Sequence, residues 1–394
     1  MFKYGRRRIF VILGTVLVVI SLLLMMFCVE IGQKLNKEHP EPYQKATFIL
    51  AVAISLTAGN IVQSPARTLC SDVTPPSQQN LMSNICQVYS GFASIFSNII
   101  GATQLYKYTS LSQEPFILVV SLAIAFVAML VSCISTPEEP LREKPPKINP
   151  FTAIWSSFKK IPRPFKRVIP AFTLAYVATY QYQVAFSDFM GRDIFGGNND
   201  QTIADKSLNE KYQDGLSWAM MCNIMNNAVQ LVYGFLNSKV SEKIGMKWVM
   251  IIGNGLMGVA LMLFFFMDNQ YAYFIATSFL GLGNVVYMAV PYAIVSLCIP
   301  TEELGSNLGI LNCFGVLGQQ VSNFGIGSGL SKLGGDWNTA RYKIGISCIF
   351  GYLGMIASFW VVQPTLAESG QYNAIPEISG ESGTAGMNTI SIVE

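Results

Sequence analysis

Runs of about twenty apolar residues recur along this chain, and they constrain its fold more than any other feature. A helix that spans a bilayer needs about 20 mostly apolar residues, because the hydrocarbon core is about 30 Å thick. The runs cover residues 9–31, 47–70, 81–105, 115–135, 168–190, 214–238, 246–267, 271–299, 306–330 and 343–362. The sequence therefore predicts an all-α membrane protein with about ten transmembrane helices.

Composition excludes several other classes of protein. Hydrophobic residues make up 51% of the chain and charged residues only 12%, whereas soluble domains carry about 25% charged residues. A net charge of +3 is too small to indicate nucleic-acid binding. His39 is the only histidine, and the eight cysteines form no Cys-x-x-Cys motif. We therefore expect no metal site, no cofactor and no nucleic-acid partner.

One long basic segment divides the chain into unequal parts. Between Ser135 and Val168 it carries eight Lys or Arg against three Glu, which places it in the cytoplasm by the positive-inside rule. With that orientation 16 Lys or Arg lie inside and 10 outside. The expected organisation is a four-helix N-terminal half-bundle at 1–135, a basic linker at 136–167, a six-helix half-bundle at 168–362 and a disordered cytoplasmic tail at 363–394.

Internal repetition indicates two related halves. KYGRRRIFVILG at 3–14 resembles KIGMKWVMIIG at 243–253, and AGNIV at 58–62 resembles LGNVV at 282–286. Two helices precede the second basic loop and none precedes the first, so we expect two parallel six-helix repeats with the first two helices absent from this sequence. The alternative, a signal peptide, is disfavoured because the first apolar run exceeds a typical h-region of about 7–15 residues and lacks a cleavage site.

Several stretches resemble the glycoside/pentoside/hexuronide cation symporters of the major facilitator superfamily, and within them the sucrose/proton symporters. The matching stretches are GRRRIF at 5–10, AGNIVQSPARTLCSDV at 58–73, FSDFMGRDIFGGN at 186–198, YQDGLSWAMMCNIMNN at 212–227, VPYAIVSLCIP at 290–300 and NLGILN at 307–312. The resemblance implies a helical bundle of two pseudo-symmetric halves that transports a sugar with protons by alternating access. Its partners would be the sugar, protons and the lipid bilayer, and it would act as a monomer.

A charged cluster at the outer end of the run 168–190 is the candidate for proton coupling. Asp188 and Arg192 are spaced i, i+4, so they share a helix face, and Asp193 follows directly. Protonation of a paired carboxylate releases the arginine, which can couple proton uptake to other contacts. The alternative is a surface ion pair worth about 0 to 1 kcal/mol. The resemblance assigns all three residues to the transport machinery.

Two departures from the resembled family weaken the expectation of proton coupling. Leu56 stands where many sucrose-type members carry an intramembrane Asp, and Phe186 replaces the first Asp of the charged cluster. An uncoupled facilitator or an inactive, truncated homologue is therefore the alternative to a symporter. An enzyme or receptor is disfavoured, because the sequence shows no nucleophile-base set and no phosphate-binding loop.

A stripe of polar and aromatic residues on the run 168–190 is the candidate substrate site. Hydroxyl and amide groups bind sugar hydroxyls, and aromatic rings cover the C–H face of a sugar. Packing between helices through interhelical hydrogen bonds is the alternative. The stripe contains Thr173, Tyr176, Tyr180, Gln183 and Ser187, and weaker candidates are Asn60, Gln63, Asn284, Tyr287 and Asn312.

Arginines near the inner ends of two helices are the candidates for a cytoplasmic gate. Arg67 and Asp72 lie beyond Pro65, and Arg6, Arg7 and Arg8 open the chain. The resemblance implies ion pairs among these residues that break during alternation. Snorkelling of Arg67 to the membrane surface is the alternative.

Overall fold

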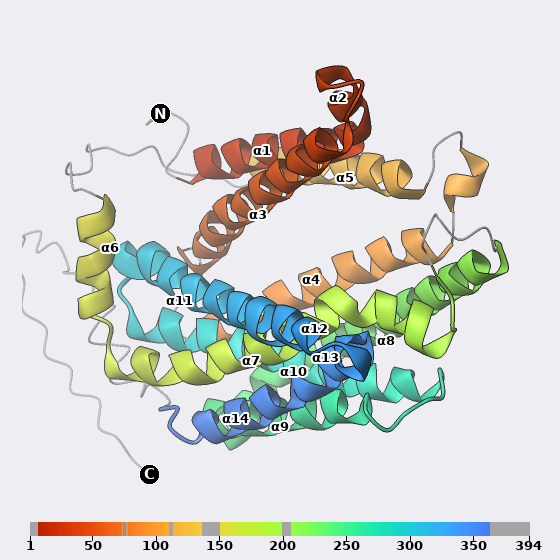
Figure 1. Ribbon diagram of the computed structural model, residues 1–394. Helices are drawn as coiled ribbons and strands as arrows, with labels where there is room; N and C mark the ends of the chain where they lie inside the picture. The colour runs from red at the N-terminus through yellow and green to blue at the C-terminus, as the bar shows by residue number, and fades with distance from the viewer. Residues whose placement is uncertain are drawn as a thin grey trace, which may run out of the picture.

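The computed structural model describes residues 7–72, 74–75, 78–103, 105–109, 113–135, 150–198 and 206–362, and this part of the chain contains helices and no strand (Figure 1). The first group of helices is α1 (Arg8–Met26), α2 (Cys28–Leu35), α3 (Glu41–Asp72), α4 (Gln79–Ala102) and α5 (Gln113–Ser135). The second is α6 (Pro150–Lys159), α7 (Arg163–Asp188), α8 (Lys206–Ile244), α9 (Met246–Leu263), α10 (Ala272–Cys298), α11 (Thr301–Val321), α12 (Gly329–Leu333), α13 (Ala340–Ile346) and α14 (Cys348–Ser358). Each predicted apolar run falls on one of these helices or on consecutive ones.

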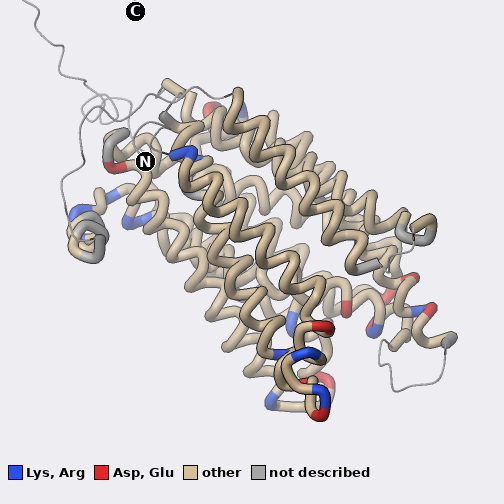
Figure 2. The backbone as a smooth tube through the Cα atoms, turned by 90° about the horizontal axis from the view of Figure 1, so that it is seen from above, with Lys and Arg blue, Asp and Glu red and all other residues tan. Residues whose placement is uncertain are grey.

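Within the described part, six helices are long and apolar enough by themselves to cross a membrane. They cover Arg8–Met26, Glu41–Ser71, Gln79–Ala102, Pro115–Ser135, Met246–Leu263 and Ala272–Cys298. Helices α7, α8 and α11 carry more amide and hydroxyl side chains, as expected of helices that face a polar interior. In Figure 2 the charged residues gather at the two ends of the bundle, and the middle is almost free of them.

The end of the bundle that holds the start of α1 and helix α6 is called the inner end here, because the basic segments lie there. The basic turn between α8 and α9 contains Gly245 at φ +87°, a left-handed conformation that favours glycine. This explains the central glycine of the second basic loop. Its predicted equivalent, Gly5, lies outside the described residues.

Helix α4 packs most closely against α8, although the two helices are far apart in the sequence. Near the inner end, Asn237 Nδ2 donates to Asn84 Oδ1 over 2.6 Å. Further along, Gly91 faces the carbonyl oxygen of Asn227, where an added Cβ would come within 3.1 Å. Helix α4 is therefore where the N-terminal helices meet the C-terminal ones. Helix α3 instead converges on α11 at the inner end and diverges from it toward the outer end (Figure 1).

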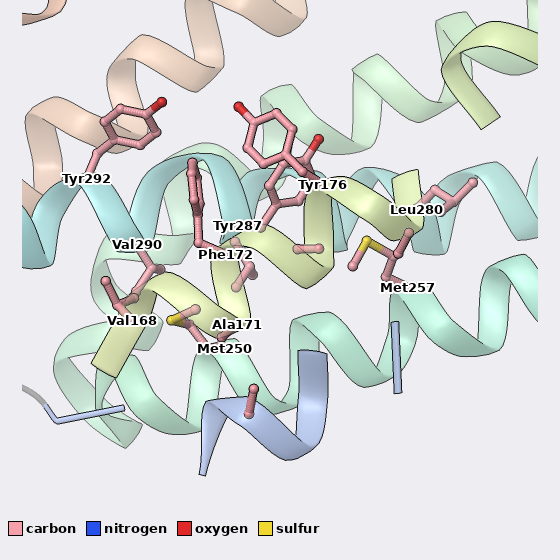
Figure 3. Packing of buried hydrophobic residues seen from close by; sticks show 14 of the residues in the cluster. Val168, Ala171, Phe172, Tyr176, Met250, Met257, Leu280, Tyr287, Val290 and Tyr292 are labelled. Atoms are coloured by element: carbon pink, nitrogen blue, oxygen red, sulfur yellow. The ribbon is translucent and has the colours of Figure 1, made fainter. Parts of the chain in front are cut away.

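The apolar core lies among α7, α9, α10 and α14. Phe172, Met250, Met257 and Leu280 are fully buried in it, and Figure 3 shows these side chains packed between the helices. Helices α1, α3 and α5 instead expose large apolar side chains such as Ile49, which is typical of a surface that faces lipid.

Two of the helices continue into π-helical turns. Helix α7 runs into a π-helix at Phe189–Ile194, and α11 into another at Ser322–Ser328. Gln181 of α7 donates to the carbonyl oxygen of Ser322 over 2.8 Å, so the second π-turn is held against α7. Such turns occur frequently at functional sites.

Candidate functional site

A cavity of about 300 Å³ lies between α4, α7, α8 and α10, and amide side chains dominate its walls. We call it the amide cavity. No charged side chain is found among the described residues that line it. It is lined by Gln87, Ser90, Ser94, Tyr182, Gln183, Phe186, Ser187, Asn223, Asn226, Asn227, Gln230, Asn284, Tyr287 and Met288.

Asn226 is the centre of the hydrogen-bond network in this cavity. It is 3% exposed, and its Nδ2 donates to the carbonyl oxygen of Thr277 over 3.0 Å. Its Oδ1 accepts from Gln230 Nε2 at 3.0 Å and from Asn284 Nδ2 at 3.4 Å. Both hydrogen-bonding ends of Asn226 are thus occupied by protein. Asn226 therefore positions Gln230 and Asn284, which face the cavity.

Asn284 leaves one acceptor unused in this network. Its Oδ1 is buried and has no hydrogen-bond partner among the described residues, whereas its Nδ2 is held by Asn226. A buried acceptor without a partner costs about 1–3 kcal/mol. Because this oxygen is buried, it can accept from a ligand hydroxyl only when the Asn284 side chain turns toward the cavity.

Aromatic rings form another part of the same wall. The Tyr182 hydroxyl donates to Asn223 Oδ1 over 2.6 Å, and the Tyr182 ring lies 4.7 Å from the ring of Phe186, centroid to centroid. Thr179 Oγ1 donates to the Tyr287 hydroxyl at 3.3 Å. The cavity thus combines fixed amide groups with apolar ring faces, the combination that a sugar requires.

A second cavity, of about 360 Å³, lies between α3 and α11. We call it the α3–α11 cavity. Its walls include Ser55, Leu56, Gly59, Asn60, Gln63, Tyr176, Asn312, Val316 and Gln319.

Tyr176 separates the two cavities. It lines the α3–α11 cavity, and its hydroxyl donates to the sulfur of Met288, which lines the amide cavity, over 3.2 Å. Its ring also packs against that of Tyr287 at 5.2 Å between centroids. In Figure 3 the hydroxyls of Tyr176, Tyr287 and Tyr292 point to the same side, away from the apolar core around Met250.

The structure thus distributes the predicted substrate residues over two cavities. Gln183 and Asn284 line the amide cavity, together with Ser187 and Tyr287. Asn60, Gln63 and Tyr176 line the α3–α11 cavity, together with Asn312.

Two members of the predicted stripe lie outside both cavities. The Thr173 hydroxyl is buried without a hydrogen-bond partner in the described part of the chain, and its backbone faces Gly318 of α11. Tyr180 is half-buried and lines neither cavity.

The predicted ion pair at the outer end of α7 is formed. Arg192 Nε lies 2.7 Å from Asp188 Oδ1, and the Tyr212 hydroxyl of α8 donates to the same oxygen at 3.4 Å. The two charged side chains are 48% and 45% exposed, so the pair contributes about 0 to 1 kcal/mol to stability.

Asp193 is held by a residue that the sequence did not indicate. Its Oδ2 accepts from the backbone N–H of Arg341 over 2.9 Å, and the Arg341 guanidinium pairs with Asp268 at 2.6 Å. Burial raises the pKa of the Asp193 carboxyl above its ordinary value, and the hydrogen bond and charge of Arg341 oppose this. Asp193 therefore connects the end of α7 to α13.

At the inner end, the predicted gate residue Arg67 contacts α10. Its guanidinium lies 3.9 Å from the centroid of the Tyr292 ring, and the Tyr292 hydroxyl donates to Asn312 Oδ1. Arg67 thus makes a cation–π contact.

The other predicted gate residues are described only in part. Arg7 is buried and Arg8 half-buried. Arg6 and the side chain of Asp72 lie outside the described residues.

The sequence interpretation missed the contribution of α4 and α8 to the amide cavity. Asn223, Asn226, Asn227 and Gln230 fall at offsets of three, four and seven along α8, the spacing of one helix face. That signal was available in the sequence. Gln87 of α4 belongs to a similar pattern, because Asn80, Asn84, Gln87 and Ser94 fall on one helix face, and this signal was also missed.

Comparison with known proteins gives one family. The model of the Major Facilitator Superfamily matches residues 2–204 and 184–380. Sucrose transport protein SUC4 of Arabidopsis thaliana is 23% identical over 92% of this chain and 78% of its own length. Sucrose transport protein SUT1 of Oryza sativa subsp. japonica is 22% identical over 91% of this chain and 76% of its own length.

Solved structures support the same fold. A bacterial homologue of the iron transporter ferroportin, in an outward-facing state, matches with a TM-score of 0.60 and 13% identity over 91% of this chain and 84% of its own. The fucose:proton symporter FucP of E. coli matches with a TM-score of 0.54 and 14% identity over 92% and 89%. The described helices and the match of the family model along the chain lead to one conclusion: this chain belongs to the Major Facilitator Superfamily and is an integral, multi-pass membrane protein.

Proposed function

We propose that this protein is a secondary transporter of an uncharged sugar, sucrose or a related disaccharide or glucoside, and that the amide cavity is its substrate site. The observation that carries the proposal is the amide cavity itself, whose described lining holds seven amide side chains and no charged one. Membership of a transporter superfamily and the similarity to sucrose transport proteins favour transport over enzymatic catalysis.

The chemistry of the cavity selects against charged solutes. Transfer of an ion from water into a site without a counter-charge costs several kcal/mol, and none of the described residues that line the amide cavity supplies such a charge. Each amide carries both a carbonyl acceptor and N–H donors, so it can bind a hydroxyl in either direction. Neutral polyhydroxy compounds fit these conditions best.

Proton symport is the mode of transport that we propose, with Asp188 as the proton acceptor. Asp188 follows Ser187, which lines the amide cavity, so this carboxylate is one residue along α7 from the cavity wall. Protonation would weaken the contact with Arg192. We propose that Asp193, which lies close to Arg192, keeps the arginine near its place during this step.

A facilitator without proton coupling is the second candidate. Leu56 lines the α3–α11 cavity at the position where the resembled family carries an acid, which favours this alternative. The expected half-bundles at 1–135 and 168–362 would serve either mode, because both modes need two parts that alternate around one site.

Uptake into proteoliposomes tests the proposed site. We expect Asn284→Ala to raise the KM for labelled sucrose about 5- to 30-fold, the equivalent of about 1–2 kcal/mol for one lost hydrogen bond to a sugar hydroxyl. Asn254→Ala is the matched control. Asn254 is also buried with an unpartnered Oδ1, but it lies on α9 and bonds to Ser358 over 3.0 Å.

We expect the control to lower thermal stability and to leave KM unchanged. An unaltered KM in Asn284→Ala would exclude the amide cavity as the substrate site. Uptake of an anionic glucuronide at a rate equal to that of sucrose would contradict the proposed selectivity.

A further inference from the structure

Helix α6 lies across the direction of the bundle helices, at the inner end of the molecule (Figure 1). It has ten residues, whereas a helix that spans a bilayer needs about 20. Because the bundle helices cross the membrane, a helix across their direction at one end lies along the membrane surface. Amphipathic helices in that position contact lipid headgroups.

Aromatic rings attach α6 to the bundle and leave one indole at the surface. Phe158 stacks on Phe314 of α11 at 6.1 Å between centroids. The Trp155 ring stacks on the other side of this pair, at 6.1 Å from Phe158, and is 61% exposed. Lys159 Nζ lies 5.6 Å from the centroid of the same indole. An exposed indole beside an ammonium group is suited to the headgroup region, where tryptophan is enriched.

Basic side chains cover the junction between α6 and α7, and we call them the basic patch. Its members are Lys159, Lys160, Arg163, Lys166 and Arg167. Phe165 and Val168 are fully buried in the core, so they fix the first turns of α7 against the bundle. Arg163, Lys166 and Arg167 fall at offsets of three and four, the spacing of one helix face. This face therefore presents its charges away from the core.

The charge of the basic patch is not neutralised by nearby carboxylates. None of its members forms an ion pair within the described part of the chain, and the sequence from Pro150 to Ser187 contains no Asp or Glu. Membrane orientation by itself requires positive charge on this side, but it requires no aromatic residues beside the charge. Clusters of about four to eight Lys or Arg on or beside an amphipathic helix are typical of sites for anionic lipid.

We propose that α6 and the basic patch bind anionic phospholipid in the leaflet at the inner end. The lysines and arginines contact the phosphate and carboxylate groups of the headgroups, and the Trp155 ring lies at the boundary between headgroups and acyl chains. An arginine can bind two phosphate oxygens at once, whereas a lysine acts as a point charge. Zwitterionic lipid carries no net charge, so it should bind more weakly.

Native mass spectrometry of the full-length protein in detergent tests this, with phosphatidylserine or phosphatidylcholine as the added lipid. We expect the first phosphatidylserine to bind at least about tenfold more tightly than phosphatidylcholine, since each basic residue near an anionic surface contributes about fivefold in binding. The triple substitution Lys159→Gln, Lys160→Gln and Arg163→Gln should remove this preference.

Brominated phosphatidylserine measures where the lipid lies. In nanodiscs that contain it, it should quench part of the tryptophan fluorescence of the unmodified protein, and the quenched part should be smaller in Trp155→Phe. Equal quenching in the two proteins would show that the lipid does not lie against α6 and would overturn the proposal.

The matched control is the triple substitution Lys239→Gln, Lys243→Gln and Lys247→Gln, around the basic turn between α8 and α9. It removes the same charge at the same end and should keep the preference for phosphatidylserine. An equal loss in both triple variants would mean that the lipid responds only to the net charge of this end. A preference that appears only after deletion of residues 365–394, which carry four Glu and no Lys or Arg, would mean that this segment occupies the patch. Either result overturns the proposal, and neither depends on the identity of the transported substrate.

Discussion

At the scale of single residues, Asp188 is the group whose chemistry bears most directly on coupling. It accepts from Arg192 and from Tyr212, which belongs to a different helix. We expect Asp188→Asn to mimic the protonated state permanently, because an amide carries no charge to hold the arginine. Uphill accumulation of sugar should then fall to equilibrium with the outside, while exchange of sugar down its gradient continues.

Proton-driven uptake in vesicles measures this, with Asp268→Asn as the control. Asp268 is also paired with an arginine at the outer end, at 2.6 Å from Arg341, but it is 82% exposed and lines neither cavity. The control should keep both accumulation and its pH dependence. If accumulation survives in Asp188→Asn with unchanged pH dependence, the proton travels by another group. If uptake by the unmodified protein shows no pH dependence, the protein is a facilitator without proton coupling.

Single residues also show how far a sequence can predict a site. Gln183 and Asn284 were indicated by helical spacing and by the internal repeat, and both line the amide cavity. Asn226 belongs to the stripe of amides on α8, which was overlooked, whereas its contact with the backbone of Thr277 on α10 depends on packing that no sequence pattern marks. The partner of Asp193 was missed for the same reason: Arg341 reaches it from 148 residues away through a backbone N–H.

At the scale of helices, the close approach of α8 and α10 determines the shape of the amide cavity. A Cβ added to Gly281 of α10 would lie 2.4 Å from the carbonyl oxygen of Asn226 and 3.2 Å from Val229. We expect Gly281→Ala to push the two helices apart. Overpacking of this kind lowers the free energy of unfolding by about 1–3 kcal/mol. The substitution should also weaken sugar binding, because a displaced Asn226 no longer holds Gln230 and Asn284 in place.

Thermal unfolding in detergent and the KM for sugar measure both effects. Gly309→Ala is the matched control, because Gly309 also lies inside a helix but has no heavy atom within 4 Å of an added Cβ. The free energy of unfolding of Gly309→Ala should stay the same or rise by up to about 1 kcal/mol, since alanine is the better helix former. Equal stabilities of the two variants would show that α8 and α10 tolerate a wider separation.

Helices were the most predictable level of this structure, because the length and hydropathy of a spanning segment are imposed by the bilayer. Apolar runs therefore coincide with helices along the chain. The π-turns at Phe189–Ile194 and Ser322–Ser328 were not predicted, since they depend on contacts such as that of Gln181 with Ser322. Nor does the sequence show that α4 lies along α8, because the polar face of α4, with Asn84 and Gln87, does not indicate which helix it meets.

At the scale of the whole molecule, the arrangement of α3 and α11 defines which end is closed. They meet at the inner end, where Thr68 packs on Gly305, and they diverge toward the outer end (Figure 1). Alternating access around one site requires the open end to change when substrate is bound. Binding of sugar should therefore shift the protein toward states with a narrower outer end, provided that the sugar binds those states more tightly.

Distances between spin labels measure this change. Labels on Lys45 of α3 and Lys332 of α12, both at the outer end, should move closer when saturating sugar is added. A second pair, Lys211 of α8 and Lys332, lies within the C-terminal helices and should keep its distance, because those helices are expected to move as one body. Ketone-bearing amino acids as label sites leave all eight native cysteines in place. A change in both pairs would mean that the bundle deforms throughout, and no change in either would show that sugar does not select between conformations that differ at the outer end.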